Sequence, residues 1–293
     1  MSIRAWLVRG QIRKIFRPKA LSDASPEARL ECMVAGFKGS EAVLPQPPAH
    51  IQAVPVEASS DAVKFKGEWI VDPSAKDDRI IFYTHGGAYI WGSPREYRYL
   101  AWLLSKACKA RVFLLDYTLA PDAQCPVQIN EGMAAYDFIR AENPNASIIM
   151  AGDSAGGSLT VAMAIAVRDS GRPAAAALSL IAPGVDLTGS GDSVRANADK
   201  DVMLDPEAVS IAIKDYIGDL PANDPRCSPL FASHENLPPM MAQVGSEEIL
   251  RDDSVRLEQS VKTSGGVFVL KIWSKMHHVW HMSANMVPEG RRA

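Results

Sequence analysis

The chain has 293 residues, of which 47% are apolar and 22% charged, and this balance excludes a disordered chain and allows a sizeable core. Its 31 basic and 34 acidic residues leave a net charge of -3 without the polybasic run that phosphate-backbone binding needs, so nucleic acid is not an expected partner. No apolar stretch reaches the roughly 18 residues of a membrane span.

Residues 1–45 are expected to form an arm in front of the main domain. Apolar and basic residues recur over residues 2–17 at roughly helical spacing, which predicts an amphipathic helix. We expect this helix to pack its apolar face on the protein as part of a lid; the alternative is that it lies on an anionic membrane surface. Its basic residues interrupt the apolar core that a signal peptide requires, so we expect a cytoplasmic protein. The prolines at 45, 47 and 48 resemble a linker.

Residues 46–293 alternate short β-like runs with helical stretches, which is typical of one α/β domain with a mostly parallel central sheet covered by helices on both faces. The segment 187–225 breaks this rhythm with Gly and Asp turns and a helix at 206–216, and we interpret it as a helical cap insertion over one end of the sheet. The strands are expected at 51–56, 63–71, 79–84, 111–116, 147–151, 176–181, 240–244 and 267–273, and the other helices at 95–110, 128–141, 155–169 and 249–263.

The strand at 147–151 is followed by the sequence GDSAGG at 152–157 and then by a helix rich in Ala, Leu, Val and Met. This is the context of a G-x-S-x-G nucleophile elbow, in which small residues let the backbone turn sharply and expose the hydroxyl of Ser154 above the sheet edge. The pattern alone arises by chance in roughly one chain of this length in ten, so the elements around it give it weight. The alternative is a glycine-rich anion-binding turn, and Asp153 in its middle argues against an anion there.

A second motif, HGGAY at 85–89, follows the strand predicted at 79–84. Its glycines allow backbone N–H groups to approach a ligand closely. Acyl transfer requires such donors to stabilise a tetrahedral oxyanion, and the residue after the nucleophile supplies another. We therefore expect the N–H groups of Ala155, Gly87 and either Gly86 or Ala88 to bind an oxyanion. A tight turn without this role is the alternative.

The general base and its acid partner are expected after the last two strands, because the chain order in this arrangement is serine, acid, histidine. Three histidines follow the strand at 267–273, namely His277, His278 and His281, and at least two of them must be bystanders. Glu247 and Glu248 follow the strand at 240–244, and at least one of them is expected to be a helix-start carboxylate favoured by the helix dipole. The position after each strand leaves both choices open.

Together these motifs resemble those of the bacterial hormone-sensitive-lipase family of esterases, also called family IV, which has the α/β-hydrolase fold. In that family the histidine precedes a small or apolar residue and an aromatic one, which selects His278. Aligning the family's Leu-Arg-Asp on residues 250–252 selects Glu248 as the acid, whereas counting from Gly245 selects Glu247; we favour Glu248, with Asp252 next. The resemblance covers nearly the whole chain, through HGGAY, DYTLAPDAQCP at 116–126, GDSAGG, DLTGSGDS at 186–193, LRDDS at 250–254 and HHVWH at 277–281.

The chain departs from the family pattern at a few positions. Ala88 replaces a glycine of the oxyanion loop but keeps its backbone N–H, so we do not count it against activity. Thr118 and Asp122 replace an arginine and a glutamate, which alters local ion pairing. Family members commonly end in a further helix, whereas this sequence stops at Ala293. A truncated chain would explain this difference.

The resemblance implies a serine carboxylesterase that hydrolyses small-molecule esters with acyl chains of a few carbons, under a lid built from residues 1–45 and 187–225. It implies no metal and no organic cofactor, and the four widely spaced cysteines, without a C-x-x-C pair, agree with free thiols and no zinc site. A lactone or amide hydrolase using the same residues is one alternative. Another is a non-catalytic small-ligand receptor of this fold, which the presence of His278 disfavours. We also consider a homodimer as a candidate assembly of this chain.

Overall fold

The central sheet is built from short apolar runs that are buried on both faces, as parallel strands between two layers of helices require. The computed structural model describes residues 1–40, 42 and 44–293; residues 41 and 43, which belong to the predicted arm, lie outside the described residues. The described residues form one sheet of eight strands, which are β1 (Ala53–Ser60), β2 (Val63–Ile70), β3 (Lys76–Thr84), β4 (Ala110–Leu115), β5 (Ser147–Asp153), β6 (Ala177–Ile181), β7 (Met240–Gly245) and β8 (Phe268–Trp273).

The strand order is β1-β2-β4-β3-β5-β6-β7-β8. β1 pairs with β2 and β2 with β4 in antiparallel fashion, and all the other pairs are parallel. The parallel strands therefore end at one common edge of the sheet. Loops that follow β3, β5, β7 and β8 meet there, which is where open α/β sheets bind their ligands.

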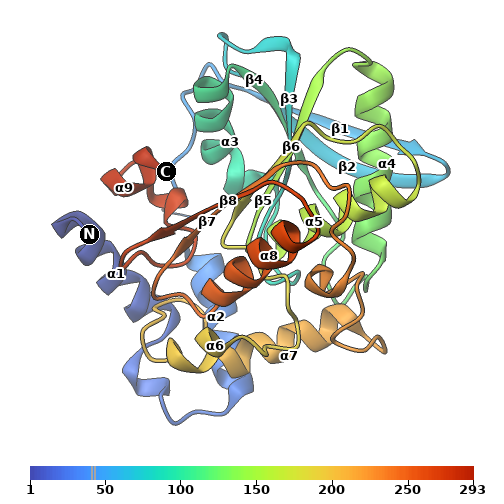
Figure 1. Cartoon of the computed structure of the whole chain (residues 1–293). Coiled ribbons are helices and arrows are strands. Elements are labelled where there is room, and N and C mark those ends of the chain that lie inside the picture. Colours follow the sequence, from blue (N-terminus) through green and yellow to red (C-terminus); the bar gives the residue numbers. More distant parts are fainter. Residues whose placement is uncertain (41, 43) are drawn as a thin grey trace.

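Helices cover both faces of this sheet (Figure 1). On one face, α3 (Pro94–Cys108) packs through Tyr97 and Leu100 on the apolar side chains of β3 and β4. On the other face lie α4 (Val127–Glu142), α5 (Ser154–Asp169) and α8 (Arg251–Thr263), which share one large apolar core with the strands. The sheet is thus sandwiched between two helical layers.

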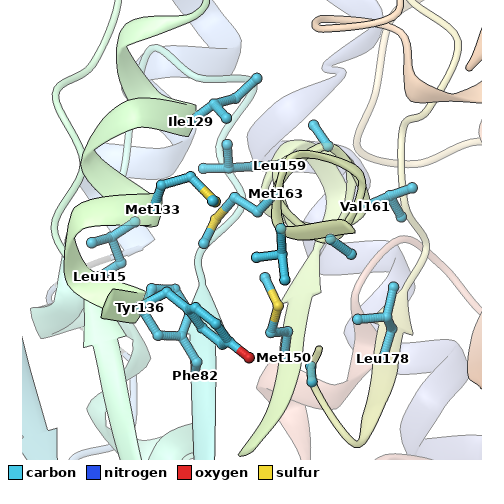
Figure 2. Close-up of a cluster of buried hydrophobic side chains, with 14 of the residues drawn as sticks. Phe82, Leu115, Ile129, Met133, Tyr136, Met150, Leu159, Val161, Met163 and Leu178 are labelled. Carbon is cyan, nitrogen blue, oxygen red and sulfur yellow. The ribbon is translucent and has the colours of Figure 1, made fainter. Parts of the chain in front are cut away.

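The larger core fixes the position of α5, the helix that begins with the predicted nucleophile. Figure 2 shows Met133 of α4 and Met163 of α5 pointing toward one another, above Phe82 and Met150 of the sheet. Phe82, Met150 and Met163 are completely buried. Because each large buried side chain of this kind contributes about 1.5–3 kcal/mol, α5 is held firmly against β3 and β5.

The first 40 residues and the segment after β6 come together on one side of the molecule. The first region contains α1 (Ile3–Phe16) and α2 (Pro26–Ser40), and the second contains α6 (Asp192–Ala196) and α7 (Pro206–Ile217). α2 packs against both α1 and α7 (Figure 1). Phe37 of α2 also contacts Phe16 edge to face, with ring centroids 5.0 Å apart, and stacks on Trp91 at 4.7 Å. The remaining helices are the short α9 (Pro288–Arg292) and single 3₁₀ turns at Lys19–Leu21, Pro229–Phe231 and Trp280–Ser283.

The predicted fold class is confirmed, since each of the eight predicted strands and each predicted helix occurs in its expected place. The helix α2 was not predicted. Its glycines at 36 and 39 lower helix propensity, and its helical state depends on packing against α1 and α7 rather than on its own sequence. No helix in the described part of the chain is both long and apolar enough to cross a membrane.

Candidate active site

The turn between β5 and α5 places Ser154 at the carboxyl edge of the sheet. β5 ends at Asp153 and Ser154 is the first residue of α5. Ser154 has a φ of 53°, a left-handed conformation that costs a residue other than glycine on the order of 1–3 kcal/mol. Such strain is the mark of a nucleophile elbow, in which the serine stands on a sharp turn between strand and helix.

Asp153 ties this elbow to the loop that follows β3. Its carboxylate is buried and accepts hydrogen bonds from Tyr83 at 2.9 Å and from Tyr97 at 3.0 Å. It also accepts the backbone N–H of Gly86 at 3.0 Å. Burial raises the pKa of Asp153 to about 6, and the two tyrosine hydroxyls oppose this shift. A buried carboxylate at this turn disfavours the anion-binding alternative for the motif.

The loop 85–89 approaches the elbow so closely that Gly86 has no room for a side chain. A Cβ on Gly86 would lie 2.3 Å from Oδ2 of Asp153 and 3.0 Å from Cβ of Ser154. The N–H of Gly86 donates to Asp153 and to the hydroxyl of Tyr97 at 3.1 Å. This N–H is therefore engaged within the protein, which favours Ala88 over Gly86, the two alternatives for one of the oxyanion donors.

The three other residues of the predicted set line the cavity at this edge. Gly87 has a φ of 115° and Ala88 a φ of 54°, and the described residues provide no acceptor for the N–H of either one. Ala155 is the second residue of α5, where helical N–H groups have no partner within their own helix. Gly87, Ala88 and Ala155 all line the same cavity as Ser154. The alanine at 88 occupies a left-handed position that glycine would adopt more easily.

Loops after the last two strands bring His278 and Glu248 together. Nδ1 of His278 lies 2.6 Å from Oε2 of Glu248, and both side chains are buried. Facing a carboxylate, Nδ1 must carry a proton, which leaves Nε2 as the unprotonated nitrogen of the neutral ring. Burial lowers the pKa of His278, but the hydrogen bond and charge of Glu248 raise it to a net value above normal. Burial raises the pKa of Glu248, and the N–H of Gly245 binds its other oxygen at 2.5 Å.

The other candidates of these two loops have different surroundings. His277 and His281 are buried without a carboxylate partner among the described residues, and burial lowers the pKa of each to about 3. Glu247 pairs with Arg9 at 2.5 Å, and its side chain is 25% exposed. The helix α8 begins at Arg251, so Glu247 lies four residues before the helix and not at its start, where it was expected. Asp252 accepts the N–H of Ser193 at 2.8 Å and pairs with Arg251.

A cavity of about 410 Å³ connects these groups. Ser154 and His278 both line it, on the side formed by the sheet. The rest of the wall is largely apolar, and much of it comes from the first 40 residues and the segment after β6, through side chains that include Ile12, Phe16, Phe37, Leu187, Val209 and Ile213. Mostly apolar pockets with a few convergent polar groups are typical of small-molecule sites.

A family model described as the alpha/beta hydrolase fold matches residues 81–282. An acetyl-hydrolase of Streptomyces hygroscopicus is 37% identical over 227 residues, which are 77% of this chain and 76% of that protein. A crystal structure titled as an esterase from the bacterial hormone-sensitive lipase family has a TM-score of 0.88 and 33% identity, over 100% of this chain and 95% of that one. The chain belongs to this esterase family.

The esterase is also similar to the crystal structure titled EstE5 soaked with p-nitrophenyl butyrate, with a TM-score of 0.89 and 32% identity over 100% of this chain and 95% of that one. These findings confirm the predicted family and the predicted enzyme class, a carboxylic ester hydrolase. Within the described residues no three His, Cys, Asp or Glu side chains come together as metal ligands would.

The sequence interpretation missed the polar groups that hold the loop after β7, which carries Glu248 and is called the acid loop below. Asn197 donates to the backbone carbonyl of Glu248 at 2.9 Å, and Asp201 accepts the N–H of Ile249 at 3.0 Å. Ser193 donates to the carbonyl of Ile249 at 2.6 Å. The spacing of these three residues gave no signal, because Ser193 lies in the short helix α6, Asn197 and Asp201 follow it, and all three become neighbours of the loop only in the fold.

Proposed function

We propose that this esterase hydrolyses short-chain acyl esters through an acyl-enzyme on Ser154, with His278 as general base and Glu248 as its acid partner. The hydrogen bond of 2.6 Å between His278 and Glu248, in a cavity that Ser154 also lines, is the observation that supports this assignment most directly. Glu247 is engaged by Arg9 and supports no competing pair.

In the first half-reaction, Oγ of Ser154 attacks the ester carbonyl while Nε2 of His278 takes the hydroxyl proton. Glu248 holds the proton on Nδ1, so Nε2 is free to accept, and its charge stabilises the imidazolium that forms. The tetrahedral intermediate collapses when His278 gives its proton to the leaving alkoxide. Water then attacks the acyl-serine by the same steps, which releases the carboxylic acid and regenerates Ser154.

The negative charge of each tetrahedral intermediate needs prepositioned donors. The N–H groups of Gly87, Ala88 and Ala155 are our choice, because they line the cavity and the first two have no acceptor in the described chain. Removing one such donor in a comparable enzyme costs about 10²–10³ in kcat. The oxygen that develops charge would sit among these three groups.

The preference for short acyl chains rests on the cavity. About 410 Å³ is enough for a small ester, and the wall formed by α1, α2 and α7 limits how far a chain can extend. We assign these helices the role of a lid, formed by residues 1–45 and the insertion at 187–225. A similar protein is named acetyl-hydrolase, and another was soaked with a butyrate ester, which agrees with a small acyl group.

The decisive experiment combines Ser154→Ala with covalent labelling. Ser154→Ala should abolish hydrolysis of p-nitrophenyl esters, with a circular dichroism spectrum and melting curve like those of the parent. An organophosphonate should inactivate the parent stoichiometrically and leave its adduct on Ser154 in a mass-spectrometric peptide map. Residual activity within tenfold of the parent, or an adduct on another residue, overturns the assignment.

A further inference from the structure

Three arginines spaced four residues apart attach α1 to the body of the protein. Arg9 and Arg13 lie on one face of the helix, since four residues are close to one helical turn, and Arg17 is the C-cap that follows it. Arg13 donates to the carbonyl of Asp199 at 3.0 Å, and Arg17 donates to the carbonyl of Asp201 at 2.9 Å. Within the described residues, the guanidinium groups of these two arginines form hydrogen bonds to the insertion alone.

Arg9 differs from the other two because its guanidinium reaches three separate segments. Nη1 donates to the carbonyl of Lys275 at 2.9 Å. Nη2 donates to the carbonyl of Lys200 at 3.1 Å and forms an ion pair with Glu247 at 2.5 Å. The side chain is only 13% exposed, although its bonds to the two carbonyls lie at the protein surface.

Two of these segments are the loops that carry the acid–histidine pair. Lys275 stands three residues before His278 in the loop after β8, and Glu247 is the direct neighbour of Glu248 in the loop after β7. The N–H of Lys275 also donates to Oγ of Ser246 at 2.9 Å, which joins the two loops a second time. Arg9 therefore lies where a shift of either loop changes the geometry between His278 and Glu248.

The third segment, around Lys200, holds the acid loop from its other side. Asn197 donates to the carbonyls of Glu248 at 2.9 Å and Ser246 at 3.2 Å. Asp201 accepts the N–H of Ile249 at 3.0 Å. By bonding to Lys200, which lies between Asn197 and Asp201, Arg9 fixes the support of the acid loop as well as the loop itself.

We propose that Arg9 is a positioning residue for hydrolysis, which holds the loops of Glu248 and His278 in register from the N-terminal helix. The proposal rests on the proposed function, because it takes His278 and Glu248 as the working pair. A guanidinium suits the task, since its planar fork satisfies several acceptors in fixed directions, whereas one lysine ammonium is a flexible point charge. The first helix thus contributes to the chemistry through these loops as well as closing the cavity.

The test compares Arg9→Ala with Arg13→Ala, a matched control on the same helix that loses a similar bond to the insertion but none to the two loops. The kcat and KM for p-nitrophenyl butyrate are measured for both across pH. Arg9→Ala should lower kcat about 10–100-fold with a smaller change in KM, because misplacing reacting groups by about 1 Å costs up to that much. Arg13→Ala should keep a kcat close to that of the parent.

The pH profile separates positioning from simple loss of packing. Glu248 raises the pKa of His278, so a loosened pair should move the acid limb of kcat/KM to lower pH in Arg9→Ala. Arg9→Lys should show a smaller change in the same direction, and this variant decides the question if Arg9→Ala does not fold. Equal losses in Arg9→Ala and Arg13→Ala, or an unmoved acid limb, overturn the proposal. If Ser154→Ala or Glu248→Gln retains activity, the proposed function fails instead.

Discussion

Glu247 and Glu248 are neighbours in the sequence, yet their carboxylates serve different partners: Glu247 binds Arg9 of the first helix and Glu248 binds His278. Both contacts are short, at 2.5 and 2.6 Å, but only Glu248 is completely buried. A single peptide step therefore separates a carboxylate that attaches the first helix from one that faces the histidine.

This division predicts opposite outcomes for two matched substitutions. Glu248→Gln should lower kcat by about 10³–10⁴-fold, because an amide at this position favours the wrong imidazole tautomer. Glu247→Gln should leave kcat near that of the parent, since its amide oxygen can still accept from Arg9. Steady-state kinetics with p-nitrophenyl butyrate measures both. If only Glu247→Gln loses activity, the assignment of the acid is wrong; if both variants stay active, Asp252 is the next residue to test.

The size of the cavity predicts a limit on acyl length. Activity on p-nitrophenyl esters should be highest for acyl chains of about two to eight carbons and should fall for longer ones. Each methylene contributes about 0.8 kcal/mol only if it is buried, and a cavity of about 410 Å³ cannot bury a long chain. The measurement is kcat/KM across a series from acetate to palmitate. Undiminished turnover of the long-chain esters contradicts the prediction.

The contact between loop 85–89 and the elbow predicts that Gly86 tolerates no side chain. In Gly86→Ala, the new Cβ must displace the Asp153 carboxylate or Ser154, so we expect a loss of about 1–3 kcal/mol in the free energy of unfolding and a kcat lower by more than about 10²-fold. Ala88→Gly is the control, because glycine suits its φ of 54° and keeps the N–H. Urea unfolding and esterase assays compare the two variants. Normal activity in Gly86→Ala contradicts the prediction.

Asp253 of α8 predicts a pH-dependent stability. It is buried, its Oδ2 accepts the N–H of Asp186 at 3.0 Å, and burial together with the charge of Asp186 raises its pKa to about 8. The folded protein therefore keeps a proton that the unfolded chain loses near pH 4. The contribution of protonated Asp253 to the free energy of unfolding is complete below about pH 4 and is lost as the pH rises to about 8.

Asp253→Asn keeps an acceptor oxygen but cannot ionise. Its Tm should exceed that of the parent by an amount that grows from pH 5 to pH 8, by about 2–4 °C for each kcal/mol. Glu258→Gln, which removes a negative charge from the surface of the same helix, should show no such trend. Calorimetry at several pH values tests this, and a constant difference between Asp253→Asn and the parent speaks against a raised pKa.

The sequence predicted the strands and most helices because their apolar runs and spacings are local signals. It also narrowed the candidates for the proposed acid and histidine to short stretches, since both follow predicted strands. It failed where a partner comes from far away in the chain. Gly86 and Ala88 were left as alternative donors to a substrate, because the sequence does not show that Asp153, 67 residues after Gly86, accepts the N–H of Gly86. Glu247 was expected to be a helix-start carboxylate, but Arg9 pairs with it, and no local pattern connects those two positions.

The bonds between α1 and the loop after β8 also bear on the order of folding. Arg9 meets Lys275 across 266 residues, and Ser2 donates to Glu289 across 287 residues. Contacts of such sequence separation form late, because the entropy of closing the intervening loop must be overcome first. A ribosome makes α1 long before these partners exist. We therefore expect nascent and refolding chains to acquire their secondary structure before this helix docks, and hydrolytic competence to lag behind it.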